Sequence, residues 1–375
     1  MAIKAYQYRL YPTRKQITIL ERTLENCRWV YNETLAMRKN AWEQEQRSVS
    51  YLETKRQLPL WKQQRPDLKS VHSQVLQDVS HRVELAYQAF YKRVQNGEKE
   101  VGYPRFKGKY RYDSISYTQS GFHLKSEGTI LHLSKIGDIP MVYHRPIEGV
   151  IKRVTIRRTS TGKWYTSFTV KMDEPKPADP IPLTECSVVG IDVGLTTFCT
   201  LSDGTTIENP RWFRTEEKRL AKAQRKFSRC EKGTPKRRKQ RLVVARIHET
   251  IANRRRDFAY KTAHTLTQTY DLLVFEDLTI KTMMKNHSLA KSIGDAAWNL
   301  LISTTINKAE EAGCQVVLVN PAQTTQMCSI CGTIVKKTLS DRVHTCSHCG
   351  LIMDRDLNAS RNIMRLGLQS LANTA

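Results

Sequence analysis

Four cysteines near the end of the chain have the spacing of a metal site. They form two Cys-x-x-Cys pairs with fourteen residues between them, and the four positions are Cys328, Cys331, Cys346 and Cys349. Four thiolates in this pattern bind Zn²⁺ in a closed tetrahedral site that leaves no position for a substrate. His344 and His348 are near enough to compete as ligands, but they break the pair spacing and are better explained as ordinary ribbon residues. The pattern predicts one structural zinc.

Acidic residues end two apolar segments of a chain that is otherwise strongly basic. Asp192 follows SVVGI and Glu276 follows LLVF, so each carboxylate is expected at the end of a buried strand. In one sheet these strands would be neighbours about 5 Å apart. Asp354 and Asp356, at the start of the last helical segment, supply a third candidate acid. Converging carboxylates repel one another unless cations lie between them, and such oxygen ligands suit Mg²⁺ or Mn²⁺.

Three such carboxylates permit phosphodiester hydrolysis with two metal ions. One Mg²⁺ would activate a water for in-line attack and the other would stabilise the leaving 3′ oxygen, with the ions about 3.5 to 4 Å apart. No covalent intermediate is required. The same metal chemistry serves strand transfer, so these acids alone do not separate a nuclease from a transposase.

The net charge indicates a polyanionic partner. The 375 residues include 61 Lys and Arg against 36 Asp and Glu, a formal net charge of +25, which favours nucleic acid as the partner. Residues 211–261 hold 19 of the basic and 5 of the acidic residues, a net +14, in a segment with helical periodicity. Basic clusters of this kind contact phosphates without reading bases. The candidates are Arg237, Arg238, Arg254 and Arg255.

Composition also excludes several classes of protein. No segment approaches 18 uncharged apolar residues and the start of the chain has no apolar signal core, so we expect neither a membrane span nor secretion. Nine cysteines, only four of them clustered, favour a reducing compartment over a disulfide framework. The expected location is the cytoplasm.

Changes in residue pattern predict an α+β protein of several domains. Residues 1–11 and 97–172 have the short alternating runs of an antiparallel β barrel, and residues 12–96, with three helical segments, are inserted between them. Pro59 should end or kink the second helix. The proline-rich residues 173–184 predict an interdomain linker.

The second half of the chain has the order of an RNase H-like α/β core. Three hairpin-linked strands are followed by a long helical hairpin that turns at Gly233-Thr234-Pro235, and then by alternating strands and helices. We assign this core to residues 185–327 and 350–375, with a zinc ribbon inserted at residues 328–349.

Three sequence motifs now indicate a family. GIDVGL (190–195), VFEDL (274–278) and DRDLNASRNI (354–363), with the four cysteines before the last, resemble the split RuvC nuclease domain of TnpB proteins. Those proteins belong to bacterial insertion sequences and resemble the nuclease part of type V CRISPR effectors. RLYPTRKQ (9–16) and GYPRFK (102–107) also resemble the family, so the likeness follows nearly the whole chain in order. It implies that the β barrel is a wedge domain and the helical insertion a recognition domain.

The resemblance implies an RNA-guided DNA endonuclease. Its partners would be a noncoding guide RNA from its own transposon and double-stranded DNA beside a short transposon-adjacent motif. The family pattern Asp-x-Asn-Ala fits Asp356 and not Asp354, so the implied catalytic acids are Asp192, Glu276 and Asp356, and Asp354 becomes a helix N-cap. The sequence leaves open whether one protomer acts or two pair as a homodimer.

Approximate alignment with the family suggests which residues contact nucleic acid. Tyr51, Ser73 and Gln77 are candidates for reading the DNA motif, since Gln can bond adenine in a major groove. An equal alternative is that these three are ordinary polar surface residues. Arg105 and Lys107 are expected to hold guide RNA through its backbone and shape.

Two other functions stay open at this point. One is a guided regulator that occupies DNA without cutting it, although intact acids at all three motif positions argue against a mere binder. The other is the transposase of the element, a strand-transfer enzyme, although the sequence has no His-any-His motif of a Tyr-dependent transposase.

Overall fold

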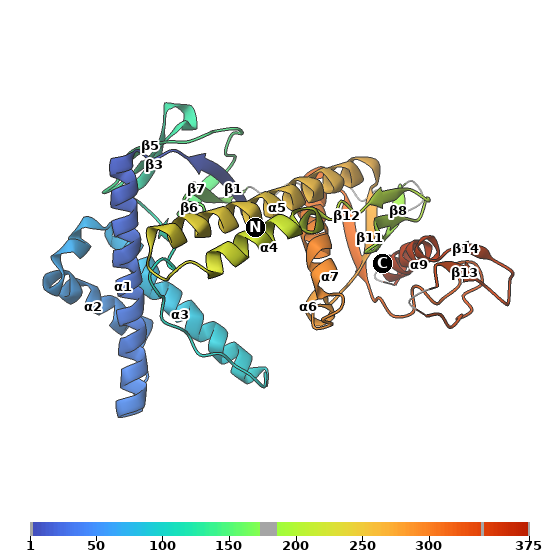
Figure 1. Ribbon diagram of the computed structural model, residues 1–375, viewed down its shortest axis with the longest axis horizontal. Helices are drawn as coiled ribbons and strands as arrows, with labels where there is room; N and C mark the ends of the chain where they lie inside the picture. Colours follow the sequence, from blue (N-terminus) through green and yellow to red (C-terminus); the bar gives the residue numbers. More distant parts are fainter. Residues whose placement is uncertain (1–2, 173–185, 339–340, 374–375) are drawn as a thin grey trace. The chain divides into compact units, whose positions relative to one another are not determined.

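The structure, a computed structural model, describes residues 3–172, 186–338 and 341–373. The chain divides into two compact units, whose described parts are residues 3–172 (unit 1) and 186–373 (unit 2) (Figure 1). Each unit has a hydrophobic core of its own. The predicted linker at residues 173–184 lies outside the described residues. No helix in the described part of the chain is long and apolar enough to cross a membrane.

Unit 1 begins with strand β1 (Ile3–Leu10) and continues with a group of helices. The helices are α1 (Arg14–Glu45), α2 (Tyr51–Gln64), the 3-10 helix η1 (Pro66–Ser70) and α3 (Ser73–Gln95). Thr13 and Ser50 each close a capping box at the start of a helix, which explains why α1 and α2 begin where they do. Helix α2 runs past Pro59 to Gln64, so this proline does not end the helix, and the alternative of a kink stays a prediction. The buried neighbour Leu58 packs in the core, which offsets the hydrogen bond that Pro59 removes.

Seven strands of unit 1 form two antiparallel sheets. One sheet has the order β1-β7-β6-β2 and the other β3-β4-β5. Apart from β1, the strands are β2 (Ser114–Tyr117), β3 (Phe122–Lys125), β4 (Ile130–Leu133), β5 (Gly137–Pro140), β6 (Val150–Arg158) and β7 (Trp164–Lys171). A bridge between Leu10 and Met141 joins the end of β1 to the segment after β5. The predicted strands are therefore present, while closure of the two sheets into a barrel stays a prediction.

Unit 2 is built on a five-stranded mixed sheet with the order β10-β9-β8-β11-β12. Its strands are β8 (Val188–Val193), β9 (Thr197–Leu201), β10 (Thr206–Glu208), β11 (Leu272–Glu276) and β12 (Gln315–Val319). The first three form the predicted antiparallel meander, and β11 pairs in parallel with both β8 and β12. Parallel pairing places the C-terminal ends of β8 and β11 at one edge of the sheet.

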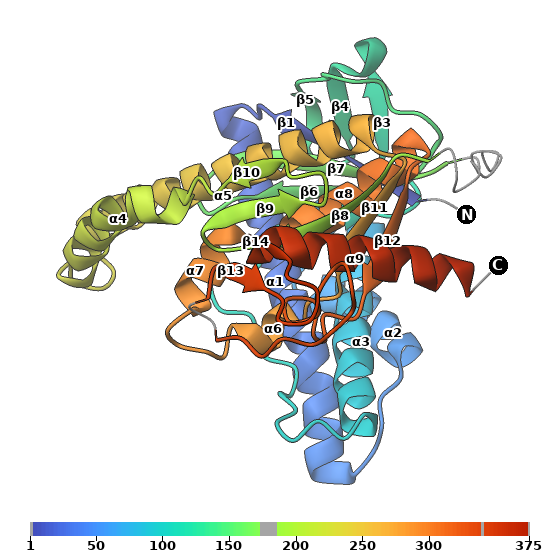
Figure 2. The same cartoon turned by 90° about the vertical axis from the view of Figure 1, so that its right-hand side faces the viewer.

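Helices cover both faces of this sheet. They are α4 (Trp212–Ser228), α5 (Pro235–Thr269), α6 (Ile280–Met283), α7 (Ala290–Ala296), α8 (Trp298–Ala312) and α9 (Arg355–Ala372). Successive residues of β11 point to opposite faces: Leu273 and Phe275 pack in the core with α5 and α8, whereas Leu272 and Val274 pack with Ile363 of α9. Figure 2 shows α9 lying across the sheet.

Two glycines allow α9 to lie directly on the sheet. A Cβ on Gly190 of β8 would come within 2.1 Å of the Ser360 carbonyl oxygen and 2.5 Å of the Met364 amide nitrogen. A Cβ on Gly367 of α9 would come within 2.5 Å of the Val274 side chain. Real Cβ atoms do not approach so closely, so only glycine fits at these positions. The first glycine of the GIDVGL motif therefore sets the distance between β8 and the N-terminal half of α9.

Candidate active site and metal centre

The four predicted cysteines meet in one place between β12 and α9. Their sulfurs all lie within 4.8 Å of one another, with 3.6 Å between Cys328 and Cys349 and 3.5 Å between Cys331 and Cys346. Four sulfurs about 2.3 Å from a tetrahedral zinc would lie about 3.8 Å apart, so the spacing fits a Zn²⁺ ion and is too long for a disulfide. The structure thus gives the chain a structural zinc site.

Two matching turns build the zinc site. The amide of Gly332 donates to the Cys328 carbonyl and the amide of Gly350 to the Cys346 carbonyl, both at 3.0 Å. Both glycines have a left-handed φ, 78° and 75°, which explains their place after each cysteine pair. Strands β13 (Val343–Thr345) and β14 (Ile352–Asp354) pair with each other on either side of the second turn. The predicted ribbon boundaries at residues 328 and 349 stay a prediction. His344 contacts Lys337 and stands outside the cysteine group.

Two asparagines of α9 connect the zinc site to the sheet. Asn358 donates from Nδ2 to the Met327 carbonyl at 2.7 Å, and its Oδ1 accepts from the Ser329 amide at 2.9 Å. Asn362 donates to the carbonyls of Met327 at 2.6 Å and Thr324 at 2.9 Å. Both asparagines are fully buried, so these bonds fix the segment before and after Cys328 against α9.

The predicted acids Asp192 and Glu276 lie on neighbouring strands and on the same face of the sheet. The parallel register pairs Phe275 with Ile191, which makes Glu276 and Asp192 the next residues of β11 and β8. Since Val274 and Gly190 face α9, the residues two positions later face α9 as well. Both acidic residues are buried, with 9% of each exposed. The structure therefore brings these two carboxylates together at one edge of the sheet.

Asp356, the third predicted acid, lies in the first turn of α9, and this helix packs against β8. Asp354 is the N-cap of this helix, because its Oδ1 accepts from the amides of Asp356 at 2.8 Å and Leu357 at 3.0 Å. Asp356 is more buried than Asp354, and its Oδ1 accepts from Nε and Nη2 of Arg355 at 3.0 and 2.9 Å. Asp354 thus has the capping role that the sequence predicted.

Burial is the main electrostatic influence on the two strand acids. Burial, as the largest cause, and the neighbouring carboxylates of Glu276 and Asp356 together raise the pKa of Asp192 from 3.8 to about 8, while Arg355 opposes them. Burial also raises the pKa of Glu276, partly offset by the hydroxyl of Thr324, which donates to its Oε1 at 2.5 Å. Buried carboxylates that repel one another are the donor set that a divalent cation stabilises.

The carboxylates form a more open group than the cysteines. Among the described residues, the cysteines are the set whose donor atoms all come within 4.8 Å, and the three acids do not reach that spacing. Within this group, Asp356 accepts a hydrogen bond from Arg355, and Glu276 accepts one from Thr324. The catalytic role of Asp192, Glu276 and Asp356 stays a prediction.

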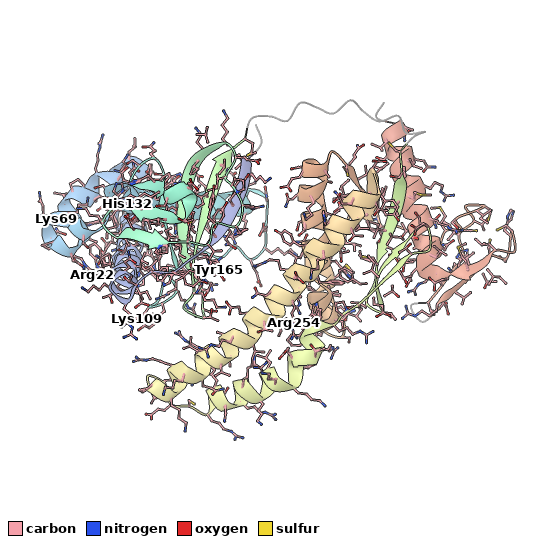
Figure 3. The ribbon with its side chains drawn as sticks, turned by 90° about the horizontal axis from the view of Figure 1, so that it is seen from above. Arg22, Lys69, Lys109, His132, Tyr165 and Arg254 are labelled. Atoms are coloured by element: carbon pink, nitrogen blue, oxygen red, sulfur yellow. The ribbon has the colours of Figure 1, made fainter. Side chains whose placement is uncertain are left out.

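Helices α4 and α5 form the predicted basic hairpin, and the turn is at the predicted place. Thr234 caps α5 and Pro235 is its first residue. Leu220 and Ala223 of α4 pack against Ile247 and Ile251 of α5, so the apolar side of the hairpin is core packing. Figure 3 shows the side chains that project from the hairpin, with Arg254 labelled on α5.

Three of the four candidate arginines of the hairpin have partners within the protein. Arg237 donates to the carbonyls of Phe227 at 3.2 Å and Cys230 at 2.6 Å, Arg254 pairs with Glu216 at 3.3 Å, and Arg255 pairs with the buried Asp295 at 2.8 Å. The fourth, Arg238, is exposed and has no hydrogen bond or ion pair from its guanidinium within the described chain. Contact of these side chains with nucleic acid stays a prediction.

The candidate DNA-reading residues of unit 1 line two hollows. One, of about 420 Å³, is lined by Ser73 and Gln77, and the other, of about 220 Å³, by Tyr51 and Gln77. Lys55 lines both hollows as well. The Ser73 hydroxyl already accepts from Lys62 at 2.9 Å. The structure therefore gathers the three predicted residues around Gln77, and their role stays a prediction.

Arg105 and Lys107 lie in an irregular segment after α3. The backbone of Lys107 is fixed by Asn32, which accepts from its amide at 2.8 Å and donates to its carbonyl at 3.1 Å. Arg28 also donates to this carbonyl at 3.1 Å. The side chain of Arg105 is exposed. The segment is therefore held on α1 while a basic side chain stays accessible.

The sequence did not identify Thr324, whose hydroxyl forms a hydrogen bond with Glu276 in the structure. Thr324 has 2% of its surface exposed, and its hydroxyl meets the carboxylate of Glu276, 48 positions earlier in the chain. No spacing rule marks a lone threonine in a loop. The only available signal was its position between β12 and the first cysteine, close to both predicted sites.

Comparison with known proteins places the chain in a family. Three family models match it: one described as "Probable transposase" over residues 167–287, one described as "Cas12f1-like, TNB domain" over residues 298–363, and one described as "Helix-turn-helix domain" over residues 1–47. Among solved structures, the cryo-EM structure of the Cas12f1-sgRNA-target DNA complex aligns with a TM-score of 0.57, over 94% of this chain and 83% of that chain. At 13% identity this likeness shows a shared multidomain α/β fold.

Two relatives match the chain over nearly its whole length. A protein of Streptomyces pristinaespiralis described as "Putative RNA-guided DNA endonuclease" is 37% identical over 98% of this chain and 90% of its own length. An Escherichia coli (strain K12) protein described as "Putative RNA-guided DNA endonuclease InsQ" is 32% identical over 99% of this chain and 94% of its own. Identity of this extent, together with the matching family models, means that the chain belongs to the TnpB family of insertion-sequence proteins.

Proposed function

We propose that this chain is an RNA-guided DNA endonuclease of an insertion sequence, which hydrolyses guide-matched DNA at Asp192, Glu276 and Asp356. The observation that carries the proposal is the position of Asp192 and Glu276, buried at the ends of neighbouring parallel strands on the face that α9 covers. Relatives described as RNA-guided DNA endonucleases support the reaction class.

Divalent cations fit the three acids, because a buried set of mutually repelling carboxylates has the oxygen donors that Mg²⁺ or Mn²⁺ prefers. Bound there, a pair of such ions supplies an activated water and charge stabilisation for phosphodiester hydrolysis. Thr324 orients the Glu276 carboxylate through its hydroxyl, and Asp354 holds the first turn of α9 so that Asp356 keeps its place. The cysteine-bound zinc has no open position and is structural.

The partners are a noncoding guide RNA and double-stranded target DNA. The match to a Cas12f1 complex with guide RNA and target DNA supports this assignment, as does the net charge of +25. In this proposal Arg238 and the other exposed basic residues of α4 and α5 hold phosphates, and Arg105 and Lys107 hold guide RNA. A homodimer is one form the active complex could take.

The domain roles follow the same scheme. Residues 1–11 and 97–172 form the wedge domain and residues 12–96 the recognition domain. Residues 185–327 and 350–375 form the RuvC-like nuclease domain, and residues 328–349 the zinc ribbon. Within the recognition domain, Gln77 lies between the two hollows with Tyr51 and Ser73 beside it, which suits contact with base edges of the adjacent DNA motif.

Cleavage of a matched duplex tests the proposal. The protein is purified with the RNA expressed from its native locus, the bound RNA is sequenced, and a duplex matching its 3′ end is supplied with Mg²⁺. We expect a defined RNA species, cleavage by the wild-type protein, and binding without cleavage by Asp192→Ala. The matched control is Asp277→Ala, which removes an exposed carboxylate next to Glu276 and should still cleave.

Other outcomes would select the alternatives. If Asp192→Ala still cleaves, the assignment of the active site is wrong. If the wild-type protein binds the matched duplex and leaves it intact, the chain is a guided regulator. If it joins the cut end to a second duplex, it is a strand-transfer enzyme. Random cellular RNA in the purified complex would exclude guiding.

A further inference from the structure

A pocket of about 440 Å³ lies in unit 2 beside the turn that follows Asp192. The lining residues that matter here are Thr196, Asn209, Arg211, Arg214, Ser292 and Asp295. They come from three separate segments: the turn between β8 and β9, the segment leading into α4, and helix α7. The pocket therefore depends on tertiary structure and not on one local motif.

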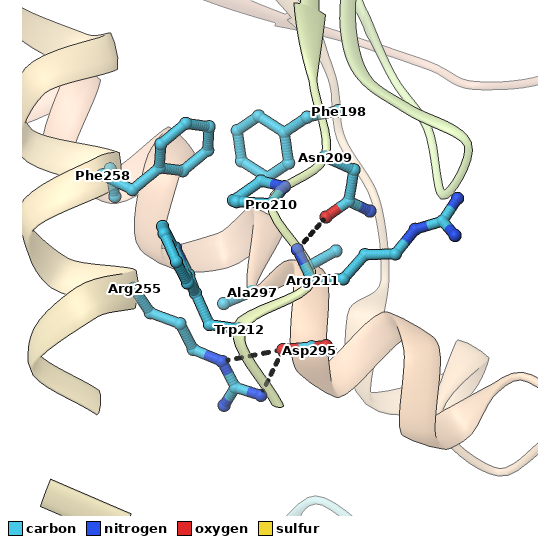
Figure 4. A pocket seen from close by; sticks show the side chains of 11 residues that line it. Phe198, Asn209, Pro210, Arg211, Trp212, Arg255, Phe258, Asp295 and Ala297 are labelled. Carbon is cyan, nitrogen blue, oxygen red and sulfur yellow. Dashed lines mark hydrogen bonds and ion pairs between the residues drawn. The ribbon is translucent and has the colours of Figure 1, made fainter. Parts of the chain in front are cut away.

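Two polar side chains hold the walls of this pocket in place. Asn209 donates from Nδ2 to the Leu195 carbonyl at 2.9 Å and accepts from the Arg211 amide at 3.1 Å, which joins the turn after β8 to the start of α4. Asp295 accepts from the amides of Phe213 and Arg214 at 2.7 and 3.2 Å. Asp295 also pairs with Arg255 (Figure 4). These partners offset its negative charge, which lowers the repulsion between Asp295 and an anion in the pocket.

Arg211 has an uncommon backbone conformation and no partner for its side chain. Its φ and ψ are 48° and 49°, in the left-handed region that a side chain with a Cβ rarely adopts. The residue is exposed, and within the described chain its guanidinium makes no hydrogen bond or ion pair. In Figure 4 the side chain extends away from Trp212 and Asp295. Backbone strain at a fixed position with an unused cationic group points to a ligand.

The remaining polar groups of the pocket suit an anion. Arg214 donates to the Ser292 hydroxyl at 3.3 Å and pairs with Glu217 at 3.4 Å, and the Thr196 hydroxyl accepts from Arg342 at 3.4 Å. Two guanidinium groups with hydroxyls beside them favour a phosphate, which accepts the paired hydrogen bonds of an arginine.

The pocket is close to the candidate active site along the chain. Thr196 is four residues after Asp192, so the two Cα atoms are at most about 14 Å apart. Successive phosphates of a DNA strand rise by about 3.4 Å along the helix axis. A phosphate held beside Thr196 would therefore belong to a nucleotide a few positions from the bond that is cut.

We propose that this pocket binds a backbone phosphate of the DNA strand being cut, with Arg211 as its main ligand. This inference rests on the proposed function, since it takes the cut strand as the occupant. Arg211, which lines the pocket, would fix the path of the strand past the carboxylates, and Asn209 holds its left-handed backbone in place.

Neutral phosphates test this contact directly. Duplexes that carry a single methylphosphonate are cut in single-turnover reactions after the complex has formed, with the neutral linkage moved through the four positions on each side of the cut. We expect one position to slow the wild-type protein about tenfold or more. In Arg211→Ala, cleavage of ordinary DNA should be slower by a similar factor, and the same methylphosphonate should add less than about a twofold loss.

A second variant excludes misfolding as the cause. Arg211→Gly relieves the left-handed backbone, so it should keep or raise the melting temperature while it cleaves as slowly as Arg211→Ala. Both variants should bind the matched duplex as the wild type does, because one phosphate is a small part of the interface. Lys308→Ala, on α8 and outside the pocket, removes one positive charge and should keep the wild-type response.

The inference is wrong if Arg211→Ala cleaves within about twofold of the wild type, or if every methylphosphonate affects the two proteins equally. Failure of the proposed function has a different signature, which is cleavage by Asp192→Ala. A result in which Asp192→Ala is inactive and no phosphate position couples to Arg211 would overturn this inference alone.

Discussion

The carboxamide of Asn358 bonds to the backbone of Met327, donating from Nδ2 to its carbonyl at 2.7 Å, and accepts from the Ser329 amide on the other side of Cys328. Asn358 is two residues after Asp356 on α9. The zinc site and the third acid are therefore connected through one buried side chain, although neither could be linked to the other by spacing alone.

Removal of zinc should reduce both stability and cleavage. Loss of the metal frees the backbone around Cys328, which leaves the buried Asn358 unsatisfied and loosens the start of α9. We expect a zinc-selective chelator, or Cys349→Ser, to lower the melting temperature by several degrees and to slow cleavage at saturating Mg²⁺. Zinc content, thermal melting and cleavage are measured together. Cys230→Ser is the control, and a zinc-free protein with full activity would contradict the prediction.

The two aspartates at the start of α9 should respond differently to substitution. Asp356→Ala should abolish cleavage with little loss of stability. Asp354→Ala should cost about 1 kcal/mol of stability, because it removes the N-cap, and should keep measurable cleavage. Asp354→Ser restores a cap and should recover the stability. Denaturant unfolding and single-turnover cleavage check these expectations. If Asp354→Ser is fully stable but inactive, Asp354 and not Asp356 would be the third catalytic acid.

Asp192 should make the metal-free protein less stable as pH rises. Burial and the neighbouring carboxylates raise its folded pKa from 3.8 to about 8, so between these values the folded protein keeps a proton that the unfolded chain has released. Stability then falls with rising pH across this window. Asp192→Asn removes the effect and should raise the melting temperature at pH 8 by about 4 °C or more, with little difference near pH 4. Melting curves of the wild type and Asp192→Asn, recorded without divalent metal, measure this difference. Equal melting temperatures of the two proteins at pH 8 would refute the raised pKa.

Gly190 should not tolerate a side chain. Alanine there would place its Cβ 2.1 Å from the Ser360 carbonyl oxygen, so α9 must move away from β8 and take Asp356 with it. We expect Gly190→Ala to lower stability by about 1 to 3 kcal/mol and to slow cleavage about tenfold or more. Gly102→Ala, with no atom within 4 Å of the new Cβ, is the control. If Gly190→Ala kept normal activity, close packing of α9 on β8 would not be needed to position the active site.

Arg237 and Arg238 are adjacent but should differ in effect. Arg237 caps the end of α4 through two carbonyl oxygens, so Arg237→Ala should lower the melting temperature. Arg238 is exposed without such bonds, so Arg238→Ala should keep stability and reduce the salt dependence of nucleic-acid binding by about one phosphate contact. Affinity measured over a series of salt concentrations checks this. If the salt dependence of the affinity is unchanged in Arg238→Ala, Arg238 does not contact a phosphate of the nucleic acid.

Local patterns predicted most of the elements, since they depend on neighbours in sequence. Gly233-Thr234-Pro235 marks the hairpin turn, and the structure confirms it. The capping boxes of Thr13 and Ser50 are equally local, since each joins residues three positions apart. Helices α6 and α7 were missed because each is too short to show a helical period. The local rule for Pro59 left two outcomes open, and burial of Leu58 favours the one in which the helix continues.

The sequence by itself determined the zinc ligands, the candidate acids and the order of the strands, because pair spacing and strand alternation are properties of the chain at short range. The sequence also predicted that the strands ending in Asp192 and Glu276 are neighbours. Only the tertiary structure decided the parallel register of β8 with β11, that Thr324 bonds to Glu276, and that Arg255 pairs with Asp295. These contacts join residues that are tens of positions apart. They form because helices and strands bury their apolar faces together, and that packing then determines which polar side chains meet.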